Sequence, residues 1–246
     1  MEIARAAAGL FVSRGLKATR AEDIALAAGI APRTFYRYFA TKEEAVAPLY
    51  AAGAQRWAEA VREAPAELTV PEALEHAVRY TLVPGRGVSA ASWEWVRTLI
   101  RLAGTSPALG KVWAEVCHTS EARLAQVLTE RTAASSRTPA SESTSGSTAE
   151  STAENPSGST AEAISDVGPG AAADATSAPT PAPDNVASPY QRFTAAVAGA
   201  AVRVAVESWA VTDSPPTGRQ GPAELALRNL RALRGFAWEE IPTEEP

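Results

Sequence analysis

The segment from Thr19 to Glu44 constrains the fold of this chain more than any other stretch. Thr19 is followed three residues later by Glu22, a spacing that fits the S/T-x-x-E capping box of a helix start. Thr41 and Glu44 repeat the same spacing. In such a box the hydroxyl and the carboxylate each accept a hydrogen bond from a backbone N–H group that lacks a partner within the helix. We therefore expect two helix starts, each one residue after its threonine.

A second short helix fits between these two starts. Gly29 follows the alanine-rich run from Ala25 to Ala28, where a residue in the left-handed conformation would end the first helix. Pro32 stands in the first turn of the next helix, where a missing N–H group costs nothing and the fixed φ angle suits the helix. The segment thus predicts a short helix, a tight turn and a second short helix ending at Phe39, which is the arrangement of a helix-turn-helix.

The helix from Pro32 to Phe39 carries side chains that suit nucleic acid. Arg33 and Arg37 are four residues apart, so they share one face of the helix. Phe35 and Phe39 have the same spacing and predict an apolar face that packs on the rest of the domain. The second helix of a helix-turn-helix enters the major groove with its N-terminal residues at the base edges. We therefore predict that this helix binds double-stranded DNA.

The run AGIAPRTFYRYFATKEEAV, preceded by the amphipathic segment from Ile3 to Arg14, resembles the N-terminal domain of the TetR family of transcriptional regulators. The resemblance covers roughly the first 50 residues. Ala31 departs from the pattern, because a serine often caps the recognition helix here, and losing that acceptor costs about 1 kcal/mol in typical cases. The residues that carry the resemblance are Thr34, Phe35, Tyr36, Phe39 and Lys42.

The resemblance implies DNA-contact roles for particular residues. It places the polar recognition-helix residues at bases or phosphates, and Lys42 at a helix start where its ammonium group would hold a phosphate. Arg20 occupies a second phosphate-contact position, in the first turn of the preceding helix. For Tyr36 and Tyr38 the alternative is a place in the core. The predicted DNA-binding residues are Arg20, Arg33, Thr34, Tyr36, Arg37, Tyr38 and Lys42.

At 246 residues, the chain is long enough for a second, larger hydrophobic core. No stretch has the composition of a membrane span, since Arg203 interrupts the run of small apolar residues from Phe193 to Val206. The N-terminus also lacks a secretory pattern, so we expect a cytoplasmic protein. A single cysteine, Cys117, excludes an internal disulfide. With only two scattered histidines beside it, we expect neither a metal site nor a cofactor.

The net charge of −5 is unevenly distributed along the chain. Residues 1–50 hold seven basic and five acidic residues, whereas residues 132–189 hold one basic and seven acidic residues. The acidic segment consists mainly of Ser, Thr, Ala, Pro, Gly and Glu, lacks aromatic residues and contains the hexapeptide SGSTAE twice. It has too little apolar surface to offset the entropy of ordering, so we expect a disordered insertion. The insertion is either a tolerated loop or an acidic segment that competes with DNA or binds a partner.

The rest of the chain has helical periodicity and no run of alternating β-branched residues, so we predict an all-α fold. We divide it into a helix-turn-helix domain (1–45), an effector-binding and dimerisation domain (46–131 and 190–246) and the insertion (132–189). The expected helices of the larger domain are 43–63, 70–83, 89–103, a long helix from 107, 190–211 and 223–236.

The resemblance implies that the last two helices pair with those of a second subunit, forming a homodimer that binds a palindromic operator. Packing within one chain is the alternative. It also implies a cavity in the larger domain for a small hydrophobic effector. Candidate wall residues are Trp93, Arg97 and Trp113, each of which could equally belong to the core, and a buried Arg97 would need an anionic partner.

The most concrete functional prediction is a repressor that binds DNA with its cavity empty and releases it when the effector binds. The alternative is a DNA-binding regulator without a small-molecule effector, controlled by a partner that binds the acidic insertion. We do not expect an enzyme, because the sequence has no nucleophile elbow, no glycine-rich phosphate loop and no usable Ser, His and Asp set.

Overall fold

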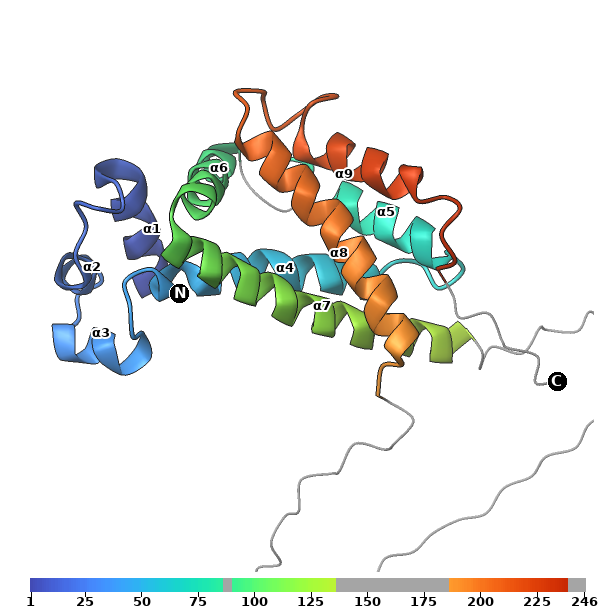
Figure 1. The fold of residues 1–246 in the computed structure, drawn as a ribbon, viewed down its shortest axis with the longest axis horizontal. Coiled ribbons are helices and arrows are strands. Elements are labelled where there is room, and N and C mark those ends of the chain that lie inside the picture. The colour runs from blue at the N-terminus through green and yellow to red at the C-terminus, as the bar shows by residue number, and fades with distance from the viewer. Residues whose placement is uncertain (86–89, 136–185, 239–246) are drawn as a thin grey trace, which may run out of the picture.

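The computed structural model of the chain describes residues 1–85, 90–135 and 186–238, and all regular elements within these residues are helices. The N-terminal helices form one end of the molecule, and the later helices form the rest, with α8 crossing α7 (Figure 1). The first group comprises α1 (Glu2–Arg14), α2 (Ala21–Ala27) and α3 (Pro32–Tyr38). The second comprises α4 (Ala47–Arg62), α5 (Val70–Thr81), α6 (Ala90–Thr105), α7 (Pro107–Ser135), α8 (Pro189–Ala210) and α9 (Pro222–Ala232). The prediction of an all-α fold is confirmed.

Glycines follow the first two helices, and Gly29 does so at the expected place. Gly15 has a φ angle of +83° and Gly29 one of +68°, values that residues with a Cβ atom rarely adopt. The turn between α2 and α3 therefore depends on Gly29. Pro32 is the first residue of α3, as predicted from its position in the sequence.

The first predicted capping box is wrong by one residue. Arg20 precedes α2, and its backbone N–H group donates to Oδ2 of Asp23 at 2.9 Å. Thr19 is buried instead, and its hydroxyl group donates to the carbonyl oxygen of Gly15 at 2.9 Å. A buried hydroxyl group needs a partner inside the domain, and this one finds it in the loop before α2. Glu22 is consequently free of a capping role.

The second predicted box is formed in part. The backbone N–H group of Glu44 donates to the Thr41 hydroxyl oxygen at 3.3 Å, while the Glu44 carboxylate accepts from the N–H group of Ala40 at 2.9 Å. A short 3₁₀ turn, η1 (Glu44–Val46), follows, and α4 begins only at Ala47. The expected helix start near Lys42 therefore lies several residues too early.

The ends of the predicted insertion are helical. α7 continues to Ser135, and α8 begins at Pro189 behind a capping box in which Ser188 and Gln191 bond each other's backbone N–H groups at 3.1 and 2.7 Å. Residues 136–185 lie outside the described part of the chain, and with them the predicted disorder and the predicted partner site. At the other end, α9 stops at Ala232, four residues before the predicted end.

Two large hydrophobic cores hold the described residues together, and a third cluster forms around Trp93 and Trp209. The larger core joins α4, α5, α7, α8 and α9 through residues such as Trp57, Leu74 and Leu124. The smaller core contains Phe11 and Phe35 of the N-terminal helices. It is completed by residues of α6 and α7, including Leu99, Ala103, Leu109 and Val112. The N-terminal helices are thus packed directly on α6 and α7.

Candidate nucleic-acid interface and internal cavity

The recognition helix α3 has one face in the core and one in solvent. Phe35 is fully buried, Phe39 is partly buried, and their ring centres are 5.5 Å apart. Arg33 and Arg37 are exposed. Because the phenylalanines anchor α3, the rest of the helix can face a duplex without loss of packing.

Arg37 and Tyr38 form a pair on the exposed side of α3. The guanidinium carbon of Arg37 lies 5.0 Å from the centre of the Tyr38 ring, and Nη2 donates to the Tyr38 hydroxyl oxygen at 3.1 Å. Tyr38 is 61% exposed, so it is not a core residue. This contact holds a planar donor group in a fixed orientation at the surface.

Tyr36 has a role that the sequence did not indicate. Its hydroxyl group donates to Oε1 of Glu22 at 3.1 Å, which joins α3 to α2. This hydrogen bond raises the pKa of the Tyr36 hydroxyl, with smaller contributions from burial and from the carboxylate charge. The residue is 52% exposed, so a position in the core is excluded for Tyr36 too. Glu22 is available for this bond because Asp23 caps α2.

Lys42 is tied to the protein backbone. Its ammonium group donates to the carbonyl oxygens of Leu16 and Thr19, each at 2.7 Å, and its side chain is 23% exposed. This structural role could not be predicted from the sequence, because the carbonyl groups belong to a loop more than 20 residues earlier in the chain. An ammonium group has three donors, and beyond these two hydrogen bonds Oε1 of Glu43 lies 4.0 Å from Nζ, so the predicted phosphate contact would have to use the N–H group beside this carboxylate.

The remaining predicted DNA-binding residues lie in the same part of the molecule. Arg20 is exposed at the start of α2, and Thr34 is half-buried in the first turn of α3. The exposed arginines thus come from both helices of the motif, with the lysine at the end of the loop that follows α3.

A cavity of about 210 Å³ lies among α4 to α8 in the larger domain. Trp93 and Trp113 are both in its wall, as the sequence predicted for a cavity. Trp113 packs edge-on against Tyr50 at 5.0 Å, and the Tyr50 hydroxyl group donates to the carbonyl oxygen of Leu99 at 2.9 Å. The other large apolar wall residues are Leu49, Trp57, Leu82, Val96, Ile100, Val116, Val202 and Val206.

Charged and polar groups gather around Cys117 in the cavity wall. Arg203 and Glu121 are also wall residues, and Nη1 of Arg203 lies 3.4 Å from Oε2 of Glu207. The other carboxylate oxygen of Glu207 accepts a hydrogen bond of 2.7 Å from Nε1 of Trp113. Burial raises the pKa of the Cys117 thiol to about 11; Arg203 acts in the opposite direction, and the two carboxylates add to the rise. The wall is therefore apolar over most of its area and polar at this place.

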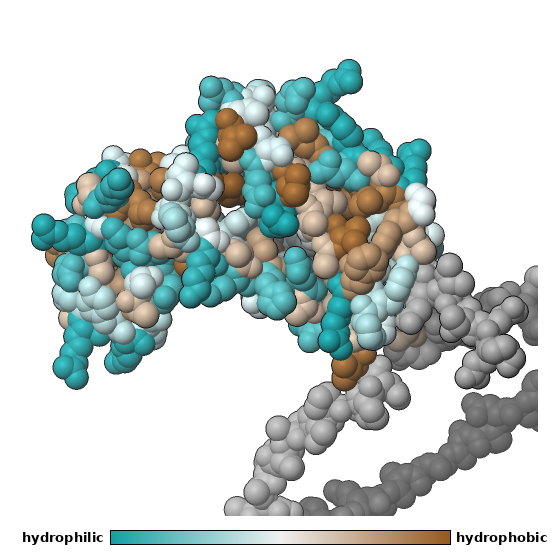
Figure 2. Space-filling model, in the orientation of Figure 1, coloured by the Kyte–Doolittle hydropathy of each residue, from teal (hydrophilic) through white to brown (hydrophobic). Residues whose placement is uncertain are grey.

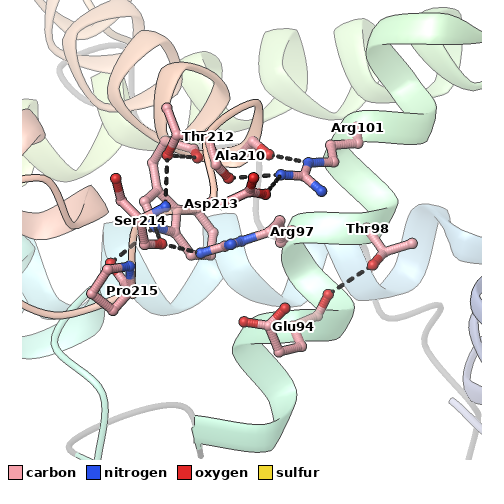
Figure 3. Close-up of polar contacts among 10 residues, drawn as sticks. Glu94, Arg97, Thr98, Arg101, Ala210, Thr212, Asp213, Ser214 and Pro215 are labelled. Atoms are coloured by element: carbon pink, nitrogen blue, oxygen red, sulfur yellow. Dashed lines mark hydrogen bonds and ion pairs between the residues drawn. The ribbon is translucent and has the colours of Figure 1, made fainter.

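Arg97 is the one predicted wall residue that does not line the cavity. It is buried, with its guanidinium carbon 4.3 Å from the centre of the Trp209 ring, and Nη2 donates to the carbonyl oxygen of Ser214 (Figure 3). The expected anionic partner is replaced by this carbonyl oxygen and the face of the indole ring. Arg97 thus connects α6 to the loop after α8.

Arg101 makes the neighbouring connection, one turn further along α6. It donates through Nε to the carbonyl oxygen of Ala210 and through Nη2 to the carbonyl oxygen of Thr212 at 2.7 Å (Figure 3). Nη2 also lies 2.9 Å from Oδ1 of Asp213. These bonds satisfy carbonyl groups at the end of α8, which the helix itself leaves without partners. Trp93 completes the contact by packing edge-on against Trp209 at 5.3 Å.

The helix-turn-helix and the larger helical domain define an all-helical DNA-binding protein. Residues 3–47 match the family model of the bacterial regulatory proteins, tetR family. The N-terminal domain of the chain is therefore similar to that of the TetR family of DNA-binding transcriptional regulators, as its sequence suggested.

The chain is also similar to solved structures of other proteins. One of them is FadR of Thermus thermophilus, a TetR-family transcriptional repressor in complex with lauroyl-CoA. Its sequence is 20% identical to this chain, the TM-score is 0.52, and the match covers 100% of this chain and 98% of FadR. A putative TetR-family regulator from Mesorhizobium loti is 16% identical in sequence, with a TM-score of 0.47, and the match covers 95% of this chain and 94% of the regulator. Among curated proteins, none matches the chain. The similarity to FadR shows a common fold.

Within the described residues, no helix is long and apolar enough to cross a lipid bilayer. The same residues contain no group of three or more His, Cys, Asp or Glu side chains that could hold a metal ion.

Proposed function

We propose that the chain is a homodimeric repressor that leaves a palindromic operator when a small hydrophobic ligand fills the cavity among α4 to α8. The observation that carries this proposal is the position of the cavity: α4, α6 and α7 line it and also pack on the DNA-binding helices. A change in the cavity therefore has a short path to the recognition helix. In this proposal residues 1–45 bind DNA, and residues 46–131 with 190–246 bind the effector and the second subunit.

The DNA-binding surface is the exposed side of α3 with the start of α2. Arg33 and Arg37 reach base edges in the major groove, where arginine makes paired hydrogen bonds to guanine. Thr34, Tyr36 and Tyr38 contact bases or phosphates beside them, and Arg20 and Lys42 contact phosphates. The Arg37–Tyr38 stack and the Tyr36–Glu22 hydrogen bond support this assignment, because both orient exposed polar groups before DNA arrives.

A stripe of apolar residues along α8 supports a homodimer. Phe193 is 54% exposed and Val204 45% exposed, with the partly buried Val197 and Ala200 between them at helical spacing. Figure 2 shows apolar residues gathered along this helix. Exposed apolar stripes of this kind mark protein interfaces. A two-fold dimer would place two recognition helices on half-sites about 34 to 36 Å apart, so it would read a palindrome.

The nature of the cavity wall supports a hydrophobic ligand with one polar end. The wall is mostly aromatic and aliphatic, and Arg203, Glu121, Cys117 and Ser120 supply the polar part. FadR, which shares this fold, holds lauroyl-CoA. An acyl chain with a polar end is therefore the first class of ligand to test.

Release from DNA follows if the ligand prefers a conformation with a different separation of the two DNA-binding domains. α6 is suited to link the two sites. On one side it carries Trp93 in the cavity wall and, through Leu99, accepts the Tyr50 hydrogen bond. On another side Trp95 lies against Gly9 of α1, where an added Cβ atom would be 3.4 Å from the indole ring. A ligand that moves α6 would move α1 with it.

The proposal is tested by selecting bound fragments from genomic DNA with the purified full-length protein and then titrating the complex with lauroyl-CoA and a panel of drug-like apolar compounds. Selective enrichment of palindromic fragments and their release by at least one apolar compound is the expected result. Failure to bind any duplex at low ionic strength, where phosphate contacts are strongest, contradicts the DNA-binding assignment.

A further inference from the structure

A second, outer cavity lies against the inner one. It is a groove of about 1020 Å³ between α4 and α7, and its walls reach Phe39 and Glu44 of the DNA-binding domain. Four residues line both the groove and the inner cavity: Ala54 and Arg56 of α4, and Val116 and Ser120 of α7. The two spaces are therefore separated by no more than a single layer of side chains.

This layer is thin because its central residues are small. The side chain of Ala54 has a single heavy atom, and that of Ser120 has only two. The neighbouring Gly53 also lines the inner cavity, and a Cβ atom added there would meet no other atom within 4 Å. Small rotations of side chains could thus open a passage between α4 and α7.

The size of the inner cavity adds a second argument. Pockets that hold drug-sized ligands usually measure about 300 to 1,000 Å³, and the inner cavity, at about 210 Å³, is smaller. An apolar group of modest size fits inside, but an amphipathic ligand of drug size or larger needs space beyond the inner wall. The adjoining groove provides this space, with Gln55, Arg56, Thr119 and Arg123 as polar groups in its walls.

We propose that the effector enters between α4 and α7 past Ala54 and Ser120, leaves its apolar part in the inner cavity and rests its polar part in the outer groove. The inference rests on the proposed effector function. Its consequence is that the bound ligand extends toward Phe39, which packs on Phe35 of the recognition helix. The ligand would then act on the DNA-binding domain directly as well as through α6.

Cys117 provides a test that requires neither DNA nor a known effector. It is the only cysteine of the chain, is partly exposed and lies in the inner cavity wall, so the rate of its alkylation by iodoacetamide, followed by mass spectrometry, reports how readily a small neutral molecule reaches the cavity. Ala54→Leu places a larger side chain at the proposed entrance and should narrow it. Ala51→Leu is the matched control, because Ala51 lies on the same helix and lines only the groove.

The same pair exists on the facing helix, as Ser120→Leu with Thr119→Leu for a control. Two independent helices guard against a variant that folds poorly. Leucine is a strong helix former, and equal far-ultraviolet circular dichroism spectra would verify that each variant is folded. Alkylation rates in urea, where all thiols are accessible, normalise the comparison.

The proposal predicts alkylation several-fold slower in Ala54→Leu and Ser120→Leu, with rates near the parent's in both controls. Rates unchanged in the two entrance variants would overturn it, and so would equal slowing by entrance and control variants. The alkylation result does not depend on release of the protein from DNA. If the entrance variants slow alkylation but no effector releases the DNA, only the proposed function is refuted. If an effector releases the DNA but the entrance variants do not slow alkylation, only this inference is refuted.

Discussion

Arg97 lies over the indole ring of Trp209, with its guanidinium carbon 4.3 Å from the ring centre and 6% of the residue exposed. The Trp209 Nε1–H group donates to the carbonyl oxygen of Ser214, the same oxygen that accepts from Arg97. Among the described residues, this cation is thus buried without a carboxylate partner, and its energy depends on one ring and one carbonyl group. The contact fixes α6 to the end of α8.

Replacing Arg97 by alanine should therefore destabilise the protein. The variant loses a charged hydrogen bond, worth about 1.5 to 3 kcal/mol, and a buried cation–π contact, worth about 2 kcal/mol, while one unfavourable desolvation is relieved. We expect a net loss of about 2 to 4 kcal/mol in the free energy of unfolding, measured by urea denaturation. Arg101→Ala, at a more exposed position, should cost less; an equal or larger cost for Arg101→Ala contradicts this ranking.

The contrast between Arg97 and Phe35 shows what could be predicted from the sequence. Phe35 and Phe39 repeat at helical spacing behind Gly29 and Pro32, and this local pattern was enough to predict the helix and its buried face. The partner of Arg97 comes from a loop more than 100 residues later. No local pattern indicates such a contact, so a cavity wall was the natural but wrong interpretation.

Lys42 illustrates the same limit within the DNA-binding domain. A lysine after a recognition helix indicates a phosphate contact, and its position in the structure is compatible with one. Its bonds to Leu16 and Thr19 depend on how the loop before α2 folds back, which sequence spacing does not determine. Trp93 and Trp113, by contrast, line the cavity, where the resemblance and the apolar, aromatic character of their helices made them candidate wall residues.

Arg33→Ala and Arg37→Ala should relax base preference. If either arginine pairs with guanine, the variant loses about 1 to 3 kcal/mol on the selected operator and much less on random DNA. Competition gel shifts with both DNAs across a series of salt concentrations measure this difference. Parallel losses on the two DNAs would show that the arginines contact only phosphates.

Lys42→Ala should lower both the stability of the protein and its affinity for DNA, whereas loss of an ordinary surface lysine at a DNA interface should lower only the affinity. Losing two charged hydrogen bonds at a partly exposed site should lower the free energy of unfolding by about 1 to 3 kcal/mol. DNA affinity should fall alike on all sequences, with a smaller salt dependence. Lys17→Ala, at an exposed position in the loop whose carbonyl groups Lys42 binds, is the control and should leave stability unchanged. A fully stable Lys42→Ala variant would contradict the structural role.

The Cys117 thiol predicts a pH dependence of both reactivity and stability. Its pKa is about 11 in the folded protein against 9.0 for an ordinary thiol, so the alkylation rate should keep rising with pH beyond 9 instead of levelling off. Below pH 9 the thiol is protonated in both the folded and the unfolded protein, so its contribution to the free energy of unfolding is fully present. Between pH 9 and 11 the unfolded state loses its proton first, so stability falls as pH rises. Cys117→Ser unfolding curves over the same range are the control, since the stability difference between the two proteins should be constant below pH 9 and should change with pH only above it.

Charge on the α8 stripe should separate the subunits. Phe193→Glu and Val204→Glu place a carboxylate where the proposed dimer would bury an apolar side chain, and an unpaired buried charge costs several kcal/mol. We expect monomers by light scattering and loss of the preference for two half-sites over one, because a monomer presents a single recognition helix. Tyr80→Glu introduces the same charge at an exposed apolar position on α5, away from the stripe, and should leave the dimer intact. If Phe193→Glu and Val204→Glu remain dimeric while folded, the subunits meet through another surface, and the half-site spacing must be derived from that surface instead.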